Sequence, residues 1–246
     1  MSGDAKQHSP ANSPPMIRAI IFDLDGTLAA TEPLHFEAFR LTLATIAIDL
    51  GRDEYFTRLI GYNDHDCFAA VMSDRGRAPD EPTIARLLAA KAAVYQATIA
   101  QRDVMYPGAA AFVRRCAERF PLILVTGTLN AEAEMILTRA GLRDRFLDII
   151  AAEDVEHGKP APDGFLAALG RLGFLLRPRP SIVAAECLAI EDTAAGIEAA
   201  RRAGMRTLGV CQTTSAEDLA AADFIRPALA TIDLDELLRD LARTGS

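Results

Sequence analysis

The chain has 246 residues, of which 50% are hydrophobic and 24% are charged, and its formal net charge at pH 7 is -8. This length can bury the core of one large domain or of two smaller ones. The acidic balance argues against nucleic acid or an anionic membrane surface as the main partner, but it leaves an anionic small substrate open, because a site can be locally positive inside an acidic protein.

Residues 1–15 are polar, rich in Ser and Pro, and without the apolar core of a signal peptide, so we interpret them as a disordered tail. No apolar run approaches the length of a membrane span. The cysteines are widely spaced and form no CxxC pair, which argues against a zinc site and favours free thiols in a reducing cytoplasm. They are Cys67, Cys116, Cys187 and Cys211.

Residues 18–23 form a short apolar run with β-branched side chains, which predicts a buried parallel strand. The patterns that follow are helical, and no strand pattern interrupts them. We predict these helices at residues 33–48, at 53–73 as two short helices broken near Gly61, and at 82–101. The sequence therefore predicts an all-helical cap, residues 31–105, inserted after the first strand.

Strands and helices alternate over the rest of the chain. We predict strands at residues 122–126, 146–151, 187–190 and 207–211, with an edge strand within 223–232. We predict helices at residues 109–119, 132–140, 163–172 and 194–203, and one more at the end of the chain. This alternation indicates an α/β fold with a Rossmann-like parallel sheet wound on both sides. Its catalytic core would comprise residues 16–30 and 106–246.

Two acidic residues, Asp23 and Asp25, follow the first predicted strand. In open α/β sheets, sites form outside the carboxyl ends of the strands, and residues two apart on a strand point the same way. Two close carboxylates repel unless a cation or a shared proton lies between them, and oxygen ligands favour a hard ion such as Mg²⁺. Taken alone, the pair is equally consistent with two solvated acids at a strand–loop junction.

Three further polar clusters lie at predicted strand ends or in the loops after them. Thr126 and Gly127 could hold the oxygens of an anion, or could form a simple turn. Lys159 lies in a loop braced by prolines and could offset phosphoryl charge, although a lone lysine is usually a solvated surface group. Glu191 and Asp192 could complete an oxygen-ligand magnesium site, or Asp192 could cap the next helix.

The order of these clusters resembles that of the haloacid dehalogenase-like superfamily. Its four motifs read here as FDLDGTL, VTGT, GKPAPDGF and AIEDTAAGIEAARRAGM. The resemblance extends from Ile17 to about Leu238. The run TEPLH, the helical insertion and the YPG at its end look similar to the β-phosphoglucomutase-like phosphatase branch.

The resemblance implies a role for each matching residue. Asp23 would attack phosphorus and become an aspartyl-phosphate, and Asp25 would act as general acid and then as general base. Thr126 and the Gly127 N–H would bind phosphoryl oxygens, and Lys159 would neutralise charge in the transition state.

The resemblance also implies a magnesium cofactor and several substrate contacts. Mg²⁺ would be held by Asp23, the backbone carbonyl of Asp25, Asp192 and, directly or through water, Glu191. Substrate-binding positions would be Thr31, His35, Lys91 and Asn130. His35 and Lys91 also fit a simpler interpretation as ordinary helix residues.

The chain departs from the mutase pattern at two points. Ala30 replaces an acid before the TEP run, and the loop after Gly61 is acidic where the mutases carry an arginine, with His65 as a weaker substitute. These departures favour a Mg²⁺-dependent phosphatase acting on a small phosphorylated metabolite, a sugar phosphate, over the alternative of a β-phosphoglucomutase-type mutase. A dehalogenase would not need Asp25, and a binding module would not need all four motifs. We expect a cytoplasmic monomer without nucleic-acid or membrane partners.

Overall fold

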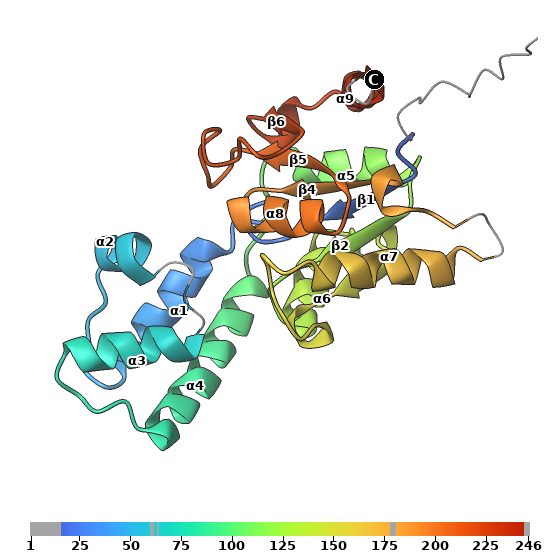
Figure 1. Ribbon diagram of the computed structural model, residues 1–246. Helices are drawn as coiled ribbons and strands as arrows, with labels where there is room; N and C mark the ends of the chain where they lie inside the picture. The colour runs from blue at the N-terminus through green and yellow to red at the C-terminus, as the bar shows by residue number, and fades with distance from the viewer. Residues whose placement is uncertain (1–15, 60–61, 63, 178–180, 244–246) are drawn as a thin grey trace, which may run out of the picture.

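The computed structural model describes residues 16–59, 62, 64–177 and 181–243, and its core is one parallel β-sheet (Figure 1). The predicted tail and the predicted helix break at Gly61 lie outside these residues. The strands are β1 (Ala19–Phe22), β2 (Leu122–Val125), β3 (Asp148–Ile150), β4 (Cys187–Glu191), β5 (Arg206–Val210) and β6 (Phe224–Arg226). Their order in this six-stranded sheet is β3-β2-β1-β4-β5-β6. The order reverses between β1 and β4, and in such sheets ligands bind outside the carboxyl ends of the strands at this point.

Helices cover both faces of the sheet because alternate strand residues face opposite sides. Ile20 and Phe22 of β1 belong to one buried apolar cluster, whereas Ala19 and Ile21 belong to the other. The first cluster includes residues of α5 (Ala109–Ala117), α6 (Asn130–Arg139) and α9 (Leu234–Arg243). The second includes residues of α7 (Asp163–Leu175) and α8 (Ala194–Arg202). The predicted doubly wound, Rossmann-like α/β core is confirmed.

Most of the segment between β1 and β2 is helical and forms a cap beside the sheet. Figure 1 shows its helices projecting from one end of the sheet. They are α1 (Glu32–Ala44), α2 (Arg52–Glu54) with a π-helical turn (Tyr55–Leu59), α3 (Asp64–Asp74) and α4 (Glu81–Ile99). These helices bury their own apolar cluster, which includes Phe39, Phe68 and Val71. A separate core of this kind lets the cap pack as a unit beside the sheet.

Element boundaries differ from the predicted ones by a few residues at most ends. The helix predicted at 132–140 begins at Asn130, because Leu129 is extended and ends the loop after β2. Within residues 223–232 only β6 is a strand, and Leu229–Thr231 forms a 3₁₀ turn. Further 3₁₀ turns span Arg143–Arg145, Ala152–Asp154 and Ala184–Glu186.

The cysteines are all free, as predicted, and burial raises the pKa of the Cys67, Cys116 and Cys187 thiols to about 12. A thiol that stays protonated at neutral pH is a poor nucleophile and a poor metal ligand. In the described part of the chain, no helix has both the length and the apolar character that crossing a bilayer requires.

Candidate active site

Three buried carboxylates meet where β1 and β4 end. Asp23 follows β1 directly, Glu191 is the last residue of β4, and Asp192 comes next. The two strands are parallel neighbours with Phe22 opposite Ile190, so their ends lie side by side. One oxygen from each carboxylate lies within 4.8 Å of the others, and the three residues are only 1–4% exposed. The pairing of β1 with β4 therefore creates an oxygen-rich cluster from residues that are far apart in the sequence.

Burial is also the main cause of the perturbed acidity in this cluster. It raises the pKa of Asp23 well above its usual value of 3.8, and the charge of Lys159 opposes that rise only partly. Burial likewise raises the pKa of Asp192 to about 6. Ionised carboxylates that lie this close to one another and are shielded from water require a compensating cation.

Lys159 supplies part of that compensation. Its Nζ lies 2.5 Å from Asp23 Oδ1 and 2.5 Å from Glu191 Oε1, and it donates to the Val125 carbonyl at 3.1 Å. Burial alone would lower the pKa of Lys159, but the two carboxylates outweigh it and raise that pKa. One ammonium beside three carboxylates leaves two negative charges uncompensated when all three are ionised. The donor set, made of carboxylate oxygens, fits a hard divalent cation.

Asp25 lies beside this cluster and is held by hydroxyl groups. Its Oδ2 accepts hydrogen bonds from Thr126 Oγ1 at 3.0 Å and from Thr128 Oγ1 at 2.5 Å. Its Oδ1 accepts from Thr31 Oγ1 at 2.6 Å. Thr126 and Thr128 belong to the core, whereas Thr31 is the N-cap residue of α1, so the Asp25 carboxylate joins the core to the cap. The sequence predicted Thr31 and Thr126 as site residues; Thr128 lies in the same predicted strand-end motif, VTGT, but its contact with Asp25 was not predicted.

The loop after β2 leaves room beside these groups. A cavity of about 220 Å³ is lined by Thr126, Gly127 and Lys159, among others. A Cβ added at Gly127 would meet no atom within 4 Å. The backbone of Gly127 is therefore open to an approaching anion.

The structure adds two polar residues, Gln212 and Thr213, that the sequence analysis missed. They follow β5, which pairs with β4. The Thr213 hydroxyl donates to Asp192, and the Gln212 side chain donates to the backbone carbonyl of Gly26 at 3.0 Å. Their position after a strand was the available signal, because the same rule identified the other clusters.

Glycine is required where the chain passes closest to the carboxylates. Gly196, in the first turn of α8, lies so close to Glu191 that an added Cβ would lie 1.9 Å from the Glu191 carboxyl carbon. At Gly26, φ is +83° and a Cβ would lie 2.1 Å from Asp192 Oδ2. The glycines of the first and fourth motifs thus keep the space that the two acids occupy.

We expect Gly196→Ala to destabilise the fold by roughly 2–3 kcal/mol, because either α8 or the Glu191 side chain must move. Unfolding by urea in the presence of EDTA measures the change. Gly170→Ala, within α7, is the matched control, since a Cβ there meets nothing within 4 Å, and it should be neutral or stabilising by up to about 1 kcal/mol. Equal stability of the two variants would contradict the assigned close packing.

The predicted cap residues His35 and Lys91 contact each other. Lys91 Nζ lies 2.8 Å from His35 Nδ1 and also bonds both carboxylate oxygens of Asp64, at 2.9 and 2.8 Å. The Lys91 side chain is 3% exposed, so the cation of this ion pair is buried. Residues of α1, α3 and α4 thus converge on one ammonium group, and the backbone N–H of His35 bonds the Thr31 carbonyl at 3.1 Å.

His35 should remain neutral at physiological pH. Burial, reinforced by the charge of Lys91, lowers its pKa to about 4 from its ordinary 6.5. The unfolded chain therefore binds more protons between these pH values, so this contribution to stability is present above pH 6.5 and is lost as the pH falls toward 4. NMR titration of the ring resonances should show no transition of His35 near pH 6.5. Lys91→Met should raise the His35 pKa, whereas His65, whose pKa Asp66 and Glu81 raise, should titrate above 6.5 in both proteins.

Asn130 is less directly tied to the site. It begins α6, and its backbone N–H donates to Glu153 Oε1 at 3.0 Å. Within the described ranges, no hydrogen bond of its side chain to the site is found. The structure instead brings Glu132, in the same first turn, to a buried position where desolvation raises its pKa to about 7. The sequence did not predict the burial of Glu132, because an acid in the first turn of a helix is usually a solvated group.

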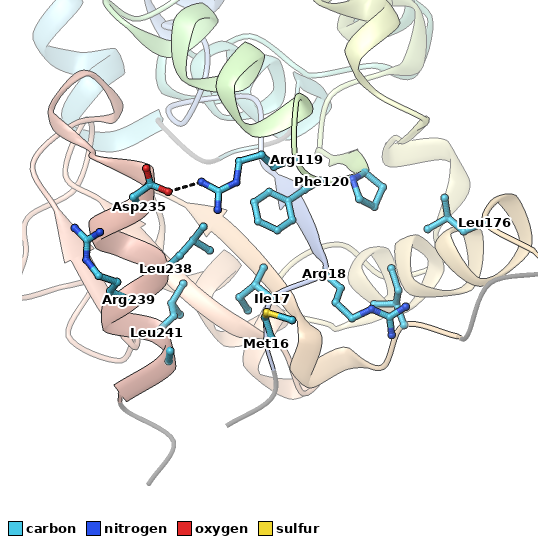
Figure 2. Close-up of a pocket in the computed structure, with 13 residues that line it drawn as sticks. Met16, Ile17, Arg18, Arg119, Phe120, Leu176, Asp235, Leu238, Arg239 and Leu241 are labelled. Carbon is cyan, nitrogen blue, oxygen red and sulfur yellow. Dashed lines mark hydrogen bonds and ion pairs between the residues drawn. The ribbon is translucent and has the colours of Figure 1, made fainter. Parts of the chain in front are cut away.

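A second hollow lies far from these residues. A cavity of about 670 Å³ is lined by Ile17, Arg18, Phe120 and residues of α9. Figure 2 shows these lining residues. Ile17 and Arg18 precede β1, and Phe120 precedes β2, so the hollow lies at the opposite end of the strands from the carboxylates. It does not contain the site residues.

Comparison with known proteins agrees with this geometry. The family model described as a haloacid dehalogenase-like hydrolase matches residues 17–204. Protein CbbY of Rhodobacter capsulatus is 36% identical over 222 residues, which are 87% of this chain and 94% of that protein. Fructose-1-phosphate phosphatase YqaB of Escherichia coli is 30% identical over 198 residues, 78% of this chain and 95% of that protein.

A solved structure is similar over most of its length. A mutant of CbbY from Rhodobacter sphaeroides, in complex with xylulose-(1,5)bisphosphate, has a TM-score of 0.73 and 30% identity. The match covers 88% of this chain and 96% of that chain. The chain is an enzyme that belongs to the haloacid dehalogenase-like hydrolase family.

Proposed function

We propose that the chain is a Mg²⁺-dependent phosphatase that hydrolyses a small phosphorylated metabolite, a sugar phosphate, through an aspartyl-phosphate. The observation that carries the proposal is the convergence of Asp23, Asp192, Glu191 and Lys159 at the ends of β1 and β4. Two relatives support the substrate class, since one is named a fructose-1-phosphate phosphatase and one holds a xylulose bisphosphate. We assign the chemistry to a core of residues 16–30 and 106–246, covered by a cap of residues 31–105.

Asp23 and Asp25 divide the reaction between them. In the first step an Asp23 oxygen bonds to phosphorus while the bond from phosphorus to the ester oxygen breaks, and Asp25 gives its proton to that leaving oxygen. In the second step water attacks the aspartyl-phosphate, Asp25 takes the water proton, and Asp23 is released. Splitting the transfer in two is ordinary covalent catalysis. The hydroxyls of Thr31 and Thr128 hold the Asp25 carboxylate between the two steps.

The remaining residues bind and stabilise charge. The Thr126 hydroxyl and the Gly127 N–H are suited to bind phosphoryl oxygens, and Lys159 offsets the charge that develops on them. Asp23, Asp192, Glu191 and the backbone carbonyl of Asp25 would hold Mg²⁺. When bound, Mg²⁺ would neutralise charge around the phosphoryl group. We also assign Thr31, His35, Lys91 and Asn130 to the substrate side of the site.

Phosphate release from a panel of sugar monophosphates tests the function. We expect turnover with Mg²⁺, and loss of turnover when EDTA removes the divalent cation. The panel should include fructose 1-phosphate and β-glucose 1-phosphate. No release from any ester with Mg²⁺ present would contradict the proposal.

The mutase alternative is tested in the same assay. A mutase would convert β-glucose 1-phosphate, given a trace of the bisphosphate, to glucose 6-phosphate faster than it releases inorganic phosphate. We expect the reverse order. The ion pair of Lys91 with Asp64 favours hydrolysis, because it occupies an ammonium that could otherwise bind the second phosphate of a bisphosphate intermediate.

A further inference from the structure

Both lysines in the described part of the chain are already paired with carboxylates. The chain has three lysines, and the third, Lys6, lies outside the described residues. Lys159 lies against Asp23 and Glu191, where the transferring phosphoryl group belongs under the proposed function. Lys91 is bonded to both oxygens of Asp64. A second anionic group that reaches Lys91 would have to compete with Asp64 for its ammonium.

Lys91 and Asp64 belong to the cap, and a chain of contacts connects Lys91 to Asp25. Lys91 contacts His35, the His35 backbone N–H bonds the Thr31 carbonyl in the first turn of α1, and the Thr31 hydroxyl donates to Asp25. The Asp64 side chain is 41% exposed, so it is accessible from solvent while the ammonium that it holds is buried. The part of a substrate that extends from phosphorus toward the cap would meet a carboxylate before it met the lysine.

The neighbouring acidic groups add negative rather than positive charge. Glu132 reaches the same region from α6, and Glu32 reaches it from α1. The charge of Lys91 lowers the pKa of both carboxyls. Burial is the first cause that raises the pKa of Glu132, to about 7, and of Glu32. Asp25 and Asp64 repel both carboxyls further. Each of these acids can accept a hydrogen bond from a hydroxyl group, and each repels a phosphate when it is ionised.

Resting on the proposed phosphatase function, we propose that Asp64 is a specificity-determining residue. By occupying Lys91 and presenting its own charge, it selects phosphate monoesters whose remaining part is uncharged and hydroxyl-bearing. It disfavours substrates that carry a second phosphate.

Binding to a hydrolysis-blocked protein tests this proposal. The full-length Asp23→Asn variant is titrated by calorimetry, in Mg²⁺, with fructose 1-phosphate and with fructose 1,6-bisphosphate. These ligands share a skeleton and differ by one phosphate. We expect the monophosphate to bind at least about tenfold more tightly. A factor of this size corresponds to one unfavourable contact between the second phosphate and the Asp64 carboxylate in a site that is partly shielded from water. Equal binding, or a preference for the bisphosphate, would overturn the proposal, and this comparison needs no change at Asp64.

Asp64→Asn in the same background isolates the residue. The bisphosphate should bind about tenfold more tightly than before, because Lys91 is released and a negative charge is removed, whereas the monophosphate should change by less than about threefold. Asp66→Asn, two residues further along α3 with a side chain that is 59% exposed, is the matched control and should change neither affinity. A bisphosphate affinity unchanged by Asp64→Asn would refute the role of Asp64.

The two proposals fail in different assays. The function is tested by phosphate release from the unmodified protein, whereas the specificity is read from binding to a protein that cannot turn over. Absence of phosphate release would count against the phosphatase and leave the charge preference measurable. Turnover of sugar monophosphates together with equal binding of both ligands would count against Asp64 alone.

Discussion

Asp23→Asn is expected to lower kcat for phosphate release by at least about 10⁴-fold, the scale seen when an enzyme loses its nucleophile. The amide cannot form the aspartyl-phosphate, yet it has the same size and shape as the carboxylate. We do not expect the substitution to destabilise the fold. Burial and the nearby charges of Glu191 and Asp192 raise the pKa of Asp23, so a neutral side chain removes repulsion from the cluster. In EDTA, the free energy of unfolding should be unchanged or higher than in the unmodified protein.

Rapid-quench labelling makes the nucleophile assignment specific. Unmodified protein mixed with a ³²P-labelled substrate and quenched in acid should retain label that hydroxylamine releases, and Asp23→Asn should retain none. Asp235→Asn is the control, because Asp235 is paired with Arg119 at the other end of the sheet. Its kcat should stay within about twofold of the parent. Undiminished turnover by Asp23→Asn would reject Asp23 as the nucleophile.

The part of the site that follows strand ends could be predicted from the sequence. Asp23, Glu191 and Asp192 each come directly after or at the end of an apolar run, and parallel strands bring such ends to one edge. Lys159 had one local signal, the prolines that brace its loop, but only the family resemblance distinguished it from a solvated lysine. Its contacts with Asp23 and Glu191 arise from the loop before α7 reaching back over the sheet.

The cap contacts could not be predicted, for a physical reason. Sequence periodicity shows which face of a helix is apolar, but not which polar residue of another helix it meets. Lys91 was identified as a candidate, whereas its partner Asp64 was seen only as part of an acidic loop. The burial of Glu132 likewise depends on α6 packing against α4, a contact between helices of two separate segments. The same packing sets the pKa of Glu132, which composition and spacing do not reveal.

Lys159→Met is the second change with a large expected effect, and it acts on both activity and stability. Without the ammonium, the charge on the phosphoryl group is no longer offset, and we expect kcat to fall about 10²- to 10³-fold, as for the loss of one group that stabilises transition-state charge. Asp23 and Glu191 would also remain buried without their partner. Breaking a buried pair in this way typically costs about 3–5 kcal/mol, so in EDTA the variant should lose about that much at neutral pH.

The pH dependence gives this prediction a definite sign. The charge of Lys159 lowers the pKa of Asp23, so the variant's Asp23 pKa should lie even further above the ordinary 3.8. A carboxyl whose folded pKa is raised contributes stability below its unfolded pKa and loses it as the pH rises through the folded value. The deficit of Lys159→Met should therefore be small near pH 4 and large at pH 8. Mg²⁺ should reduce the deficit at pH 8, because the variant's cluster carries one more uncompensated negative charge, and a cation that binds it more tightly than the parent's cluster stabilises it more by mass action.

Urea unfolding of Lys159→Met and of the unmodified protein, at pH 4 and pH 8 and with either EDTA or Mg²⁺, measures the effects on stability, and phosphate release in Mg²⁺ measures the effect on kcat. Lys91→Met is the control, because it removes the other buried lysine without touching Asp23 or Glu191. Its stability should therefore not depend on Mg²⁺ more than that of the parent. A deficit in Lys159→Met that is independent of both pH and Mg²⁺ would mean that packing of the lysine stem, rather than its charge, stabilises the cluster. In that case Asp23 would be largely protonated in the metal-free protein at neutral pH, and a cation would displace its proton on binding, which calorimetry in buffers of different ionisation enthalpy would detect.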